Sequence, residues 1–179
     1  MDPALAPALF LRVLGEQAGA LRAPVLALHR PGPARRYAGL VRVRRGGHPL
    51  ARLCAWLTHL PPAGEGRVEV NIVPEGSGER WVRHIGGRAM PSQLWAEDGL
   101  LCERLGPVEF GFGLAVCDGD LHWTVARVRL WGWLALPARW FGGVVARESA
   151  LEARYTFDVY ARLPMLGLLV HYRGWLDVP

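Results

Sequence analysis

The sequence has no lysine: all 21 of its basic residues are arginine. We attribute this bias to codon usage rather than to function. The charge is also uneven, because residues 1–66 hold nine arginines against three acidic residues, whereas the remainder holds twelve against thirteen. A basic N-terminal third could face an anionic partner or a membrane surface. A solvated face of an arginine-rich protein is the simpler interpretation, and we favour it.

Cysteine is scarce. Cys54, Cys102 and Cys117 are odd in number and have neither metal-ligand nor redox spacing. This pattern argues against a disulfide framework and is typical of small buried side chains in a reducing cytoplasm. The six histidines also lack the spacing of a metal site, so we expect no metal and no other cofactor.

Long apolar runs are absent. No stretch approaches the roughly 20 apolar residues that a membrane-spanning helix requires. The first residues, Met-Asp-Pro-Ala, lack the basic region and apolar run of a signal peptide. We therefore expect a cytoplasmic protein without a transmembrane segment, although the helix expected at 48–60 could contact a membrane peripherally.

Signatures of catalysis are missing as well. Gly111 and Gly113 lie in an expected strand that no helix follows, which excludes a phosphate-binding glycine loop and a Rossmann fold. Ser92 and Ser149 lack a nucleophile elbow, and no cysteine has a motif partner. We name no catalytic residue, and the sequence favours a protein that is not an enzyme.

Tight turns and alternating side chains dominate residues 79–133. If Asp118-Gly119 forms a two-residue turn, Val116 pairs with Leu121, Leu114 with Trp123 and Phe112 with Val125. The opposite face of this strand carries Glu109, Gly111, Gly113 and Ala115, so something bulky lies against it or the sheet bends there. The alternation breaks near Ala126-Arg127, which predicts a β-bulge.

The same reasoning predicts the other elements. Further strands are expected at 37–45, 67–74, 144–150, 154–163 and 168–175, with a loop at 131–140. Helices are expected at 9–14, closed by Gly15, and at 16–29, interrupted by Pro24. We predict one α+β domain over residues 1–179, mostly antiparallel, with a coiled sheet or barrel of about ten strands and a lipocalin-like general shape. Residues 1–34 form a helical segment packed on the sheet, and residues 35–179 form the sheet with one helix at 48–60.

The helix at 48–60 has the strongest pattern. Leu50, Leu53, Leu57 and Leu60 form one apolar stripe, and Trp56 lies near its edge. We expect this stripe to pack against the sheet, because exposing four leucines forfeits about 1.5–3 kcal/mol each. Trp56 should then be only partly covered.

Two sets of residues are candidates for a site. Glu103, Glu148 and Arg173 lie within or beside apolar strands and predict a buried ion-pair network that includes Arg173. Alternatively, Arg173 and Tyr172 orient the polar head of a ligand inside a cavity. The apolar wall of that cavity would come from Phe110, Phe112, Leu114, Trp123 and Val125. The same aromatic residues could instead fill the barrel.

A further hairpin carries Arg80, Trp81, Arg83, His84 and Arg88. It could bind phosphate or carboxylate, or stack on single-stranded nucleic acid. The nearby acidic residues favour a solvated ladder of charges across the strands instead. Nucleic-acid binding is disfavoured, because the basic residues do not concentrate in the aromatic-rich sheet.

Several short stretches carry a resemblance that covers nearly the whole chain. They are Arg12–Gly15, Leu28-His29, Leu60–Gly64, Glu79–Trp81, Gly86–Arg88 with Met90 and Ser92, Glu103–Pro107, Arg147-Glu148, Leu163-Pro164, and Gly167–Leu176. In these the chain resembles a bacterial family of uncharacterised domains, found alone or fused behind saccharopine-dehydrogenase-like NAD(P)-binding proteins. Glu152-Ala153 departs from the expected Asp-Gly type of turn. The resemblance implies a redox or lipid-modifying neighbourhood and supplies no activity.

Two functions follow as hypotheses. The first is non-enzymatic binding of a hydrophobic or amphiphilic small molecule in a barrel, with the helix at 48–60 over its mouth. The second is a docking module for an NAD(P)-dependent oxidoreductase, which would use that helix and the basic N-terminal third. A cavity above about 300 Å³ with a polar anchor favours the first, and a filled core with an exposed apolar patch favours the second.

Overall fold

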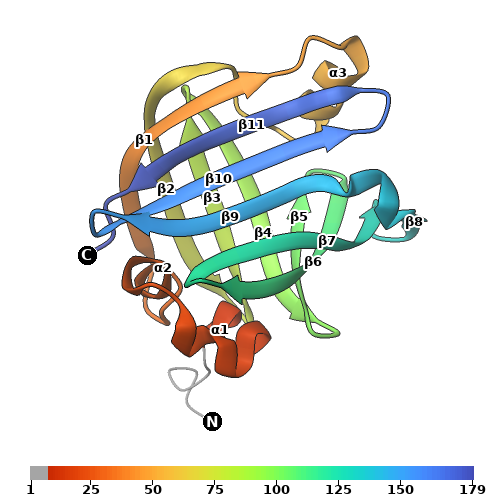
Figure 1. Ribbon diagram of the computed structural model, residues 1–179. Helices are drawn as coiled ribbons and strands as arrows, with labels where there is room; N and C mark the ends of the chain where they lie inside the picture. The colour runs from red at the N-terminus through yellow and green to blue at the C-terminus, as the bar shows by residue number, and fades with distance from the viewer. Residues whose placement is uncertain (1–7) are drawn as a thin grey trace.

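Alternating apolar and polar residues give the described part of the chain eleven β-strands, which form one antiparallel sheet in the computed structural model (Figure 1). The structure describes residues 8–179. The strands are β1 (Arg35–Arg45), β2 (Gly64–Glu75), β3 (Gly78–Ile85), β4 (Arg88–Glu97), β5 (Leu100–Leu105), β6 (Val108–Cys117), β7 (Asp120–Leu130), β8 (Leu134–Leu136), β9 (Gly143–Leu151), β10 (Arg154–Leu163) and β11 (Gly167–Leu176). The order is β6-β5-β4-β3-β2-β1-β11-β10-β9-β7-β8, and β6 also pairs with β7. That last pairing closes a barrel of ten strands and leaves β8 as an extra edge strand, which confirms the predicted fold class.

The β6–β7 hairpin has the register that the sequence predicts. Val116 pairs with Leu121, Leu114 with Trp123 and Phe112 with Val125. All of these side chains belong to the apolar core or pack against it. Gly111 pairs with Arg127 while Phe112 pairs with Val125, so Ala126 is the extra residue of a bulge. The predicted bulge is therefore confirmed.

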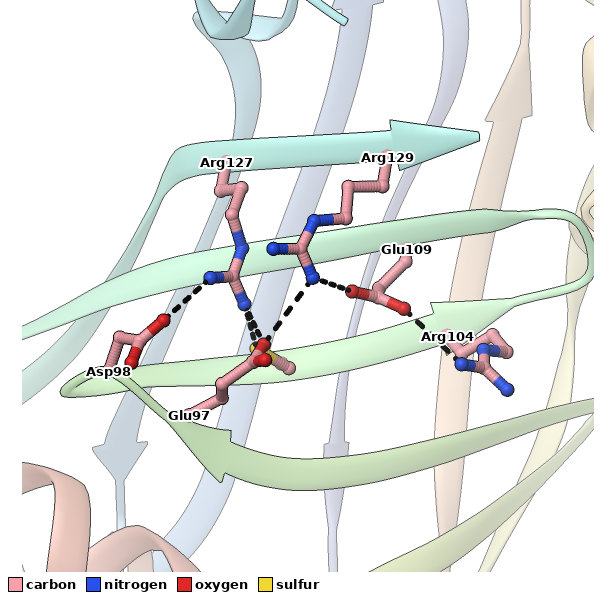
Figure 2. Close-up of polar contacts among 7 residues, drawn as sticks. Glu97, Asp98, Arg104, Glu109, Arg127 and Arg129 are labelled. Atoms are coloured by element: carbon pink, nitrogen blue, oxygen red, sulfur yellow. Dashed lines mark hydrogen bonds and ion pairs between the residues drawn. The ribbon is translucent and has the colours of Figure 1, made fainter. Parts of the chain in front are cut away.

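The outer face of the same hairpin is covered by charged side chains (Figure 2). Glu109 is buried between Arg104 and Arg129, each 3.3 Å from one of its carboxylate oxygens. Arg127 pairs with Glu97 and Asp98 and lies over Gly111, where a Cβ would be 3.1 Å from the Arg127 Cβ. Position 111 therefore has little room for a side chain larger than glycine's, because the Arg127 side chain packs closely against it. This agrees with the expectation that something bulky lies against this face.

Three short helices close one end of the barrel (Figure 1). These are α1 (Leu9–Leu14), the 3-10 helix η2 (Gly15–Ala20) and α2 (Ala23–Leu28). Phe10 is completely buried, and Arg22 Nε donates to Asp120 Oδ1 at 3.0 Å at the start of β7. The expected helices, the stop at Gly15 and the new start near Pro24 are confirmed.

The third α-helix, α3 (Pro49–Leu57), lies at the opposite end of the barrel and is shorter than the expected 48–60 (Figure 1). The prediction that its leucine stripe packs against the sheet is wrong for Leu50, Leu53 and Leu57, which are exposed, whereas Leu60 packs against the core. The buried face consists of Ala51 and Ala55. Small side chains let the helix lie close to the barrel, where the carbonyl oxygen of Leu57 would collide with any Cβ at Gly106. The helix therefore presents its larger apolar side chains to solvent.

Residues 131–140 were expected to form a loop, and this expectation is only partly correct. The segment contains β8, which pairs with the end of β7, and most of the 3-10 helix η3 (Ala138–Phe141). Trp131 and Trp133 in the turn before β8 are exposed, as is Trp140 in η3.

The β9–β10 hairpin should be stabilised by replacing Glu152-Ala153 with Asn-Gly. Leu151 pairs with Arg154, and both turn residues have positive φ, 50° and 64°. Such a turn favours Asn-Gly, because non-glycine residues are strained there. We expect the free energy of unfolding to rise by roughly 1 kcal/mol, measured by urea denaturation. Asp118→Asn in the β6–β7 turn, which already has glycine second, is the control and should change stability much less. An unchanged denaturation midpoint for the Asn-Gly variant would show that the native turn is not strained.

Candidate functional site

The barrel encloses a cavity of about 400 Å³, which lies in the size range of small-molecule sites. Its walls come from strands all around the barrel. At the end away from the N-terminal helices, Leu57 and Thr58, Pro107, Leu136 and Phe141 line it. These residues place α3, the β5–β6 turn, β8 and η3 around the same end of one cavity.

Most of the cavity wall is apolar. Of the wall residues that the sequence predicted, Phe110, Phe112, Trp123 and Tyr172 line the cavity. Leu114 and Val125 pack against the core without lining it. The aromatic side chains pack on each other, with Phe112 and Trp123 at a centroid distance of 5.4 Å and nearly perpendicular.

An ion pair lies within this apolar wall. Arg83 of β3 and Glu103 of β5 both line the cavity, and Arg83 Nη1 is 3.1 Å from Glu103 Oε1. Arg83 Nη1 also donates to Ser92 Oγ at 2.9 Å, and its guanidinium lies 4.9 Å from the Trp81 ring centroid. Burial is the largest single effect and lowers the pKa of Arg83, but the charge of Glu103 acts together with Tyr172, Tyr155 and the contact with Glu103, and the pKa rises overall. Arg83 therefore stays cationic inside the barrel.

A second polar pair lies where the N-terminal helices close the barrel. His29, which follows α2, is 2.6 Å through Nε2 from Glu148 Oε2, and both side chains are almost fully buried. Phe10 of α1 stacks on the His29 ring at a centroid distance of 3.7 Å. Glu148 lines the cavity, so this pair contributes to its floor.

Two tyrosines, Tyr155 and Tyr172, complete the polar part of the cavity wall. Burial, and then the charge of Glu148, raise the pKa of Tyr155 well above its ordinary value. Burial is also the main cause that raises the pKa of Tyr172, to about 12. Both line the cavity. Their hydroxyl groups are therefore neutral hydrogen-bonding groups at any physiological pH.

Arg173 does not belong to this site. The prediction that it is buried and pairs with Glu103 or Glu148 is wrong, because its side chain is exposed. Tyr172 points inward, and alternation along β11 therefore puts Arg173 on the outer face, opposite Arg42 and Asp158. Arg83 and His29 are the actual partners of the two glutamates.

The sequence contained a signal for Arg83. It shares the inward parity of β3 with Trp81 and Ile85, both buried, whereas Arg80 and His84 are exposed. The expected solvated charge ladder is thus wrong for Arg83 and for Glu79. Glu79 is buried, accepting from Trp81 Nε1 at 2.8 Å and pairing with Arg35 at 3.0 Å. The His29 partnership had no sequence signal, because it joins residues 119 positions apart.

Two buried polar atoms in the cavity wall have no hydrogen-bond partner among residues 8–179. One is the indole Nε1 of Trp123, a donor. The other is Glu103 Oε1, an acceptor, whose approach to Arg83 lacks hydrogen-bonding geometry. Leaving the indole N–H without a partner costs about 1–3 kcal/mol, whereas Glu103 Oε1 keeps its ion pair with Arg83.

The other features of the sequence give no further candidate site among residues 8–179. In the described part of the chain no group of three or more His, Cys, Asp or Glu side chains could hold a metal ion. The cysteines are free, but only Cys102 is fully buried, and the expectation of burial is wrong for the exposed Cys117. No helix of residues 8–179 has the length and apolarity to cross a bilayer.

The chain matches the model of a known protein family. Residues 21–176 match the model of a domain of unknown function, DUF4166. The chain belongs to this family. The matched region of this DUF4166 domain runs from α2 to the end of β11, so it includes His29, Arg83, Glu103 and Glu148. A search of curated proteins gave no match.

Proposed function

We propose that this DUF4166 domain binds an uncharged amphiphile, with an apolar body and a hydroxyl head, inside the barrel. The observation that supports this is the cavity of about 400 Å³, whose mostly apolar wall contains two polar atoms without hydrogen-bond partners among residues 8–179. Each CH₂ group that leaves water for such a wall contributes about 0.8 kcal/mol.

The class of head group follows from the charges. Each buried carboxylate of the barrel interior already faces a basic side chain: Glu103 faces Arg83, Glu148 faces His29, and Glu79 faces Arg35. A charged head would lose its hydration without finding an unpaired opposite charge. A hydroxyl both donates and accepts, and so matches Glu103 Oε1 and the Trp123 indole N–H.

Binding also suits these groups better than catalysis. Arg83 is held by Glu103 and Ser92, and His29 by Glu148 and Phe10. Groups fixed in this way can orient a ligand, and His29 itself does not line the cavity. We therefore propose a carrier or sensor role.

Filling the cavity tests the proposal. Ala146 of β9 lines the cavity, whereas Ala115 of β6 is exposed on the outer face. The uncharged fluorescent probe N-phenyl-naphthylamine should bind the native protein. Ala146→Phe should weaken its binding at least tenfold, since the added ring occupies the space of the probe. Ala115→Phe is the matched control and should bind as the native protein does. No probe binding to the native protein, or equal binding by all three proteins, would overturn the proposal.

The head group is tested by competition. Dodecanol should displace the probe at a concentration at least tenfold lower than dodecanoate or dodecylammonium, because only the alcohol brings no charge into the barrel. Equal displacement by all three would show that the polar groups of the wall take no part in binding.

Docking onto an NAD(P)-dependent oxidoreductase is the second candidate, and the exposed apolar face of α3 favours it. Hydrogen exchange tests which role α3 has. If α3 gates the cavity, dodecanol should slow amide exchange in residues 49–57. Unchanged exchange in the presence of bound dodecanol would leave the barrel as the binding site and α3 as a surface for docking.

A further inference from the structure

Large exposed apolar side chains gather at one end of the barrel. The antiparallel order places the connections after β1, β3, β5, β7 and β10 at the same end, opposite the N-terminal helices (Figure 1). We call the surface of these connections the rim. Four of the eight tryptophans are exposed there: Trp56 of α3, Trp131 and Trp133 of the β7–β8 turn, and Trp140 of η3. Met165, in the β10–β11 turn, is 97% exposed.

The charge of the rim has one sign. The connections that form it contain no Asp or Glu but include the exposed Arg52 and Arg139. These connections are residues 46–63, 86–87, 106–107, 131–142 and 164–166. The turns at the opposite end contain Asp98, Asp118 and Glu152. The rim therefore differs from the opposite end in lacking carboxylates, because that end carries acidic residues together with Arg12, Arg22 and Arg30 of the N-terminal segment.

The arginines of the rim have no carboxylate partners in the described part of the chain. Arg52 and Arg139 take part in none of the ion pairs, and neither do Arg45 and Arg88 at the strand ends beside them. Burial, followed by the charges of Arg88 and Arg52, lowers the pKa of Arg45. An anionic surface would relieve this repulsion.

We infer that the rim docks the barrel onto an anionic lipid bilayer, with its tryptophans in the headgroup region. Tryptophan is enriched at that depth because its ring is apolar and its N–H is polar. Arginine beside it is attracted by anionic lipids. The rim also borders the cavity, since Leu57, Leu136 and Phe141 line it. Docking would thus bring the cavity against the membrane, although the inference itself does not depend on what the cavity binds.

Vesicle flotation tests this inference. The full chain should float with vesicles of phosphatidylcholine and phosphatidylglycerol in equal amounts, and much less with phosphatidylcholine alone. Trp56→Gln with Trp133→Gln should weaken binding about tenfold or more. The matched control, Leu40→Gln with Leu151→Gln, removes exposed apolar side chains outside the rim and should bind like the native protein.

A second pair of variants tests the charge. Arg52→Glu with Arg139→Glu should reduce binding to the anionic vesicles at least tenfold. Arg30→Glu with Arg80→Glu reverses two exposed arginines outside the rim and should cost far less. Raising the salt concentration should weaken native binding, since it screens exposed charges.

The outcomes separate this inference from the proposed function. Ala146→Phe should float with vesicles like the native protein, and the rim variants should still bind N-phenyl-naphthylamine in water. Absence of vesicle binding, or equal loss in the control variants, overturns membrane docking. A concentration-dependent dimer that the Trp56/Trp133 variant abolishes, without vesicle binding, would assign the rim to a second copy and also overturns it.

Discussion

Gly174→Ala is expected to destabilise the barrel by more than about 3 kcal/mol, and the variant should express poorly or unfold at low urea concentration. Gly174 of β11 pairs with Val41 of β1 and with Phe157 of β10. A Cβ at this position would overlap the carbonyl oxygen of Leu40 and lie 2.9 Å from Phe157 Cζ. The obstacle is backbone in a strand paired on both sides, so it cannot move aside without breaking the ladder.

The control comes from the neighbouring strand. Gly66 of β2 also pairs with Val41, but a Cβ there would meet nothing within 4 Å. Gly66→Ala should therefore be neutral or slightly stabilising, because alanine loses less chain entropy on folding. Equal stability of the Gly174 and Gly66 variants, measured by urea denaturation, would contradict the close contact between β1 and β11.

The fold was largely predictable because each signal was local. The Asp118-Gly119 turn sets the register of its own hairpin, and the break in alternation near Ala126 locates the bulge. The closure between β6 and β7 also joins neighbours in the sequence. The choice between an open coiled sheet and a barrel was different, because it depends on pairings between distant segments, namely β1 with β11 and β7 with β9 across β8 and η3.

The candidate site was less predictable, because burial of a charged side chain depends on its partners. Arg173 and Arg83 both lie in strands that also carry buried apolar side chains, and only the alternation along each strand tells which arginine points inward. The apolar stripe of α3 shows the same limit. Periodicity predicts an apolar face, but the side that packs was decided by Ala51 and Ala55, whose small side chains allow close approach.

The largest effect on the site itself is expected for Arg83→Met. This change leaves Glu103 buried without its cationic partner, which should cost about 3–5 kcal/mol. The barrel cannot easily hydrate Glu103, whose side chain is 8% exposed and whose Oε1 already lacks a hydrogen bond. Urea denaturation should show a lower midpoint with an unchanged slope. The exposed pair of Arg36 and Glu69 supplies the control, and Arg36→Met should cost less than about 1 kcal/mol.

The double variant Arg83→Met with Glu103→Leu decides what the pair is for. Removing both charges should restore most of the stability, because apolar groups of similar size often replace a buried ion pair without loss. If Glu103 orients the hydroxyl of a ligand, the same stable variant should lose the preference for dodecanol over dodecane while still binding N-phenyl-naphthylamine. A stable double variant that keeps this preference would show that the pair is structural only. A double variant as unstable as Arg83→Met would mean instead that Arg83 acts through Ser92 and Trp81, its other two contacts.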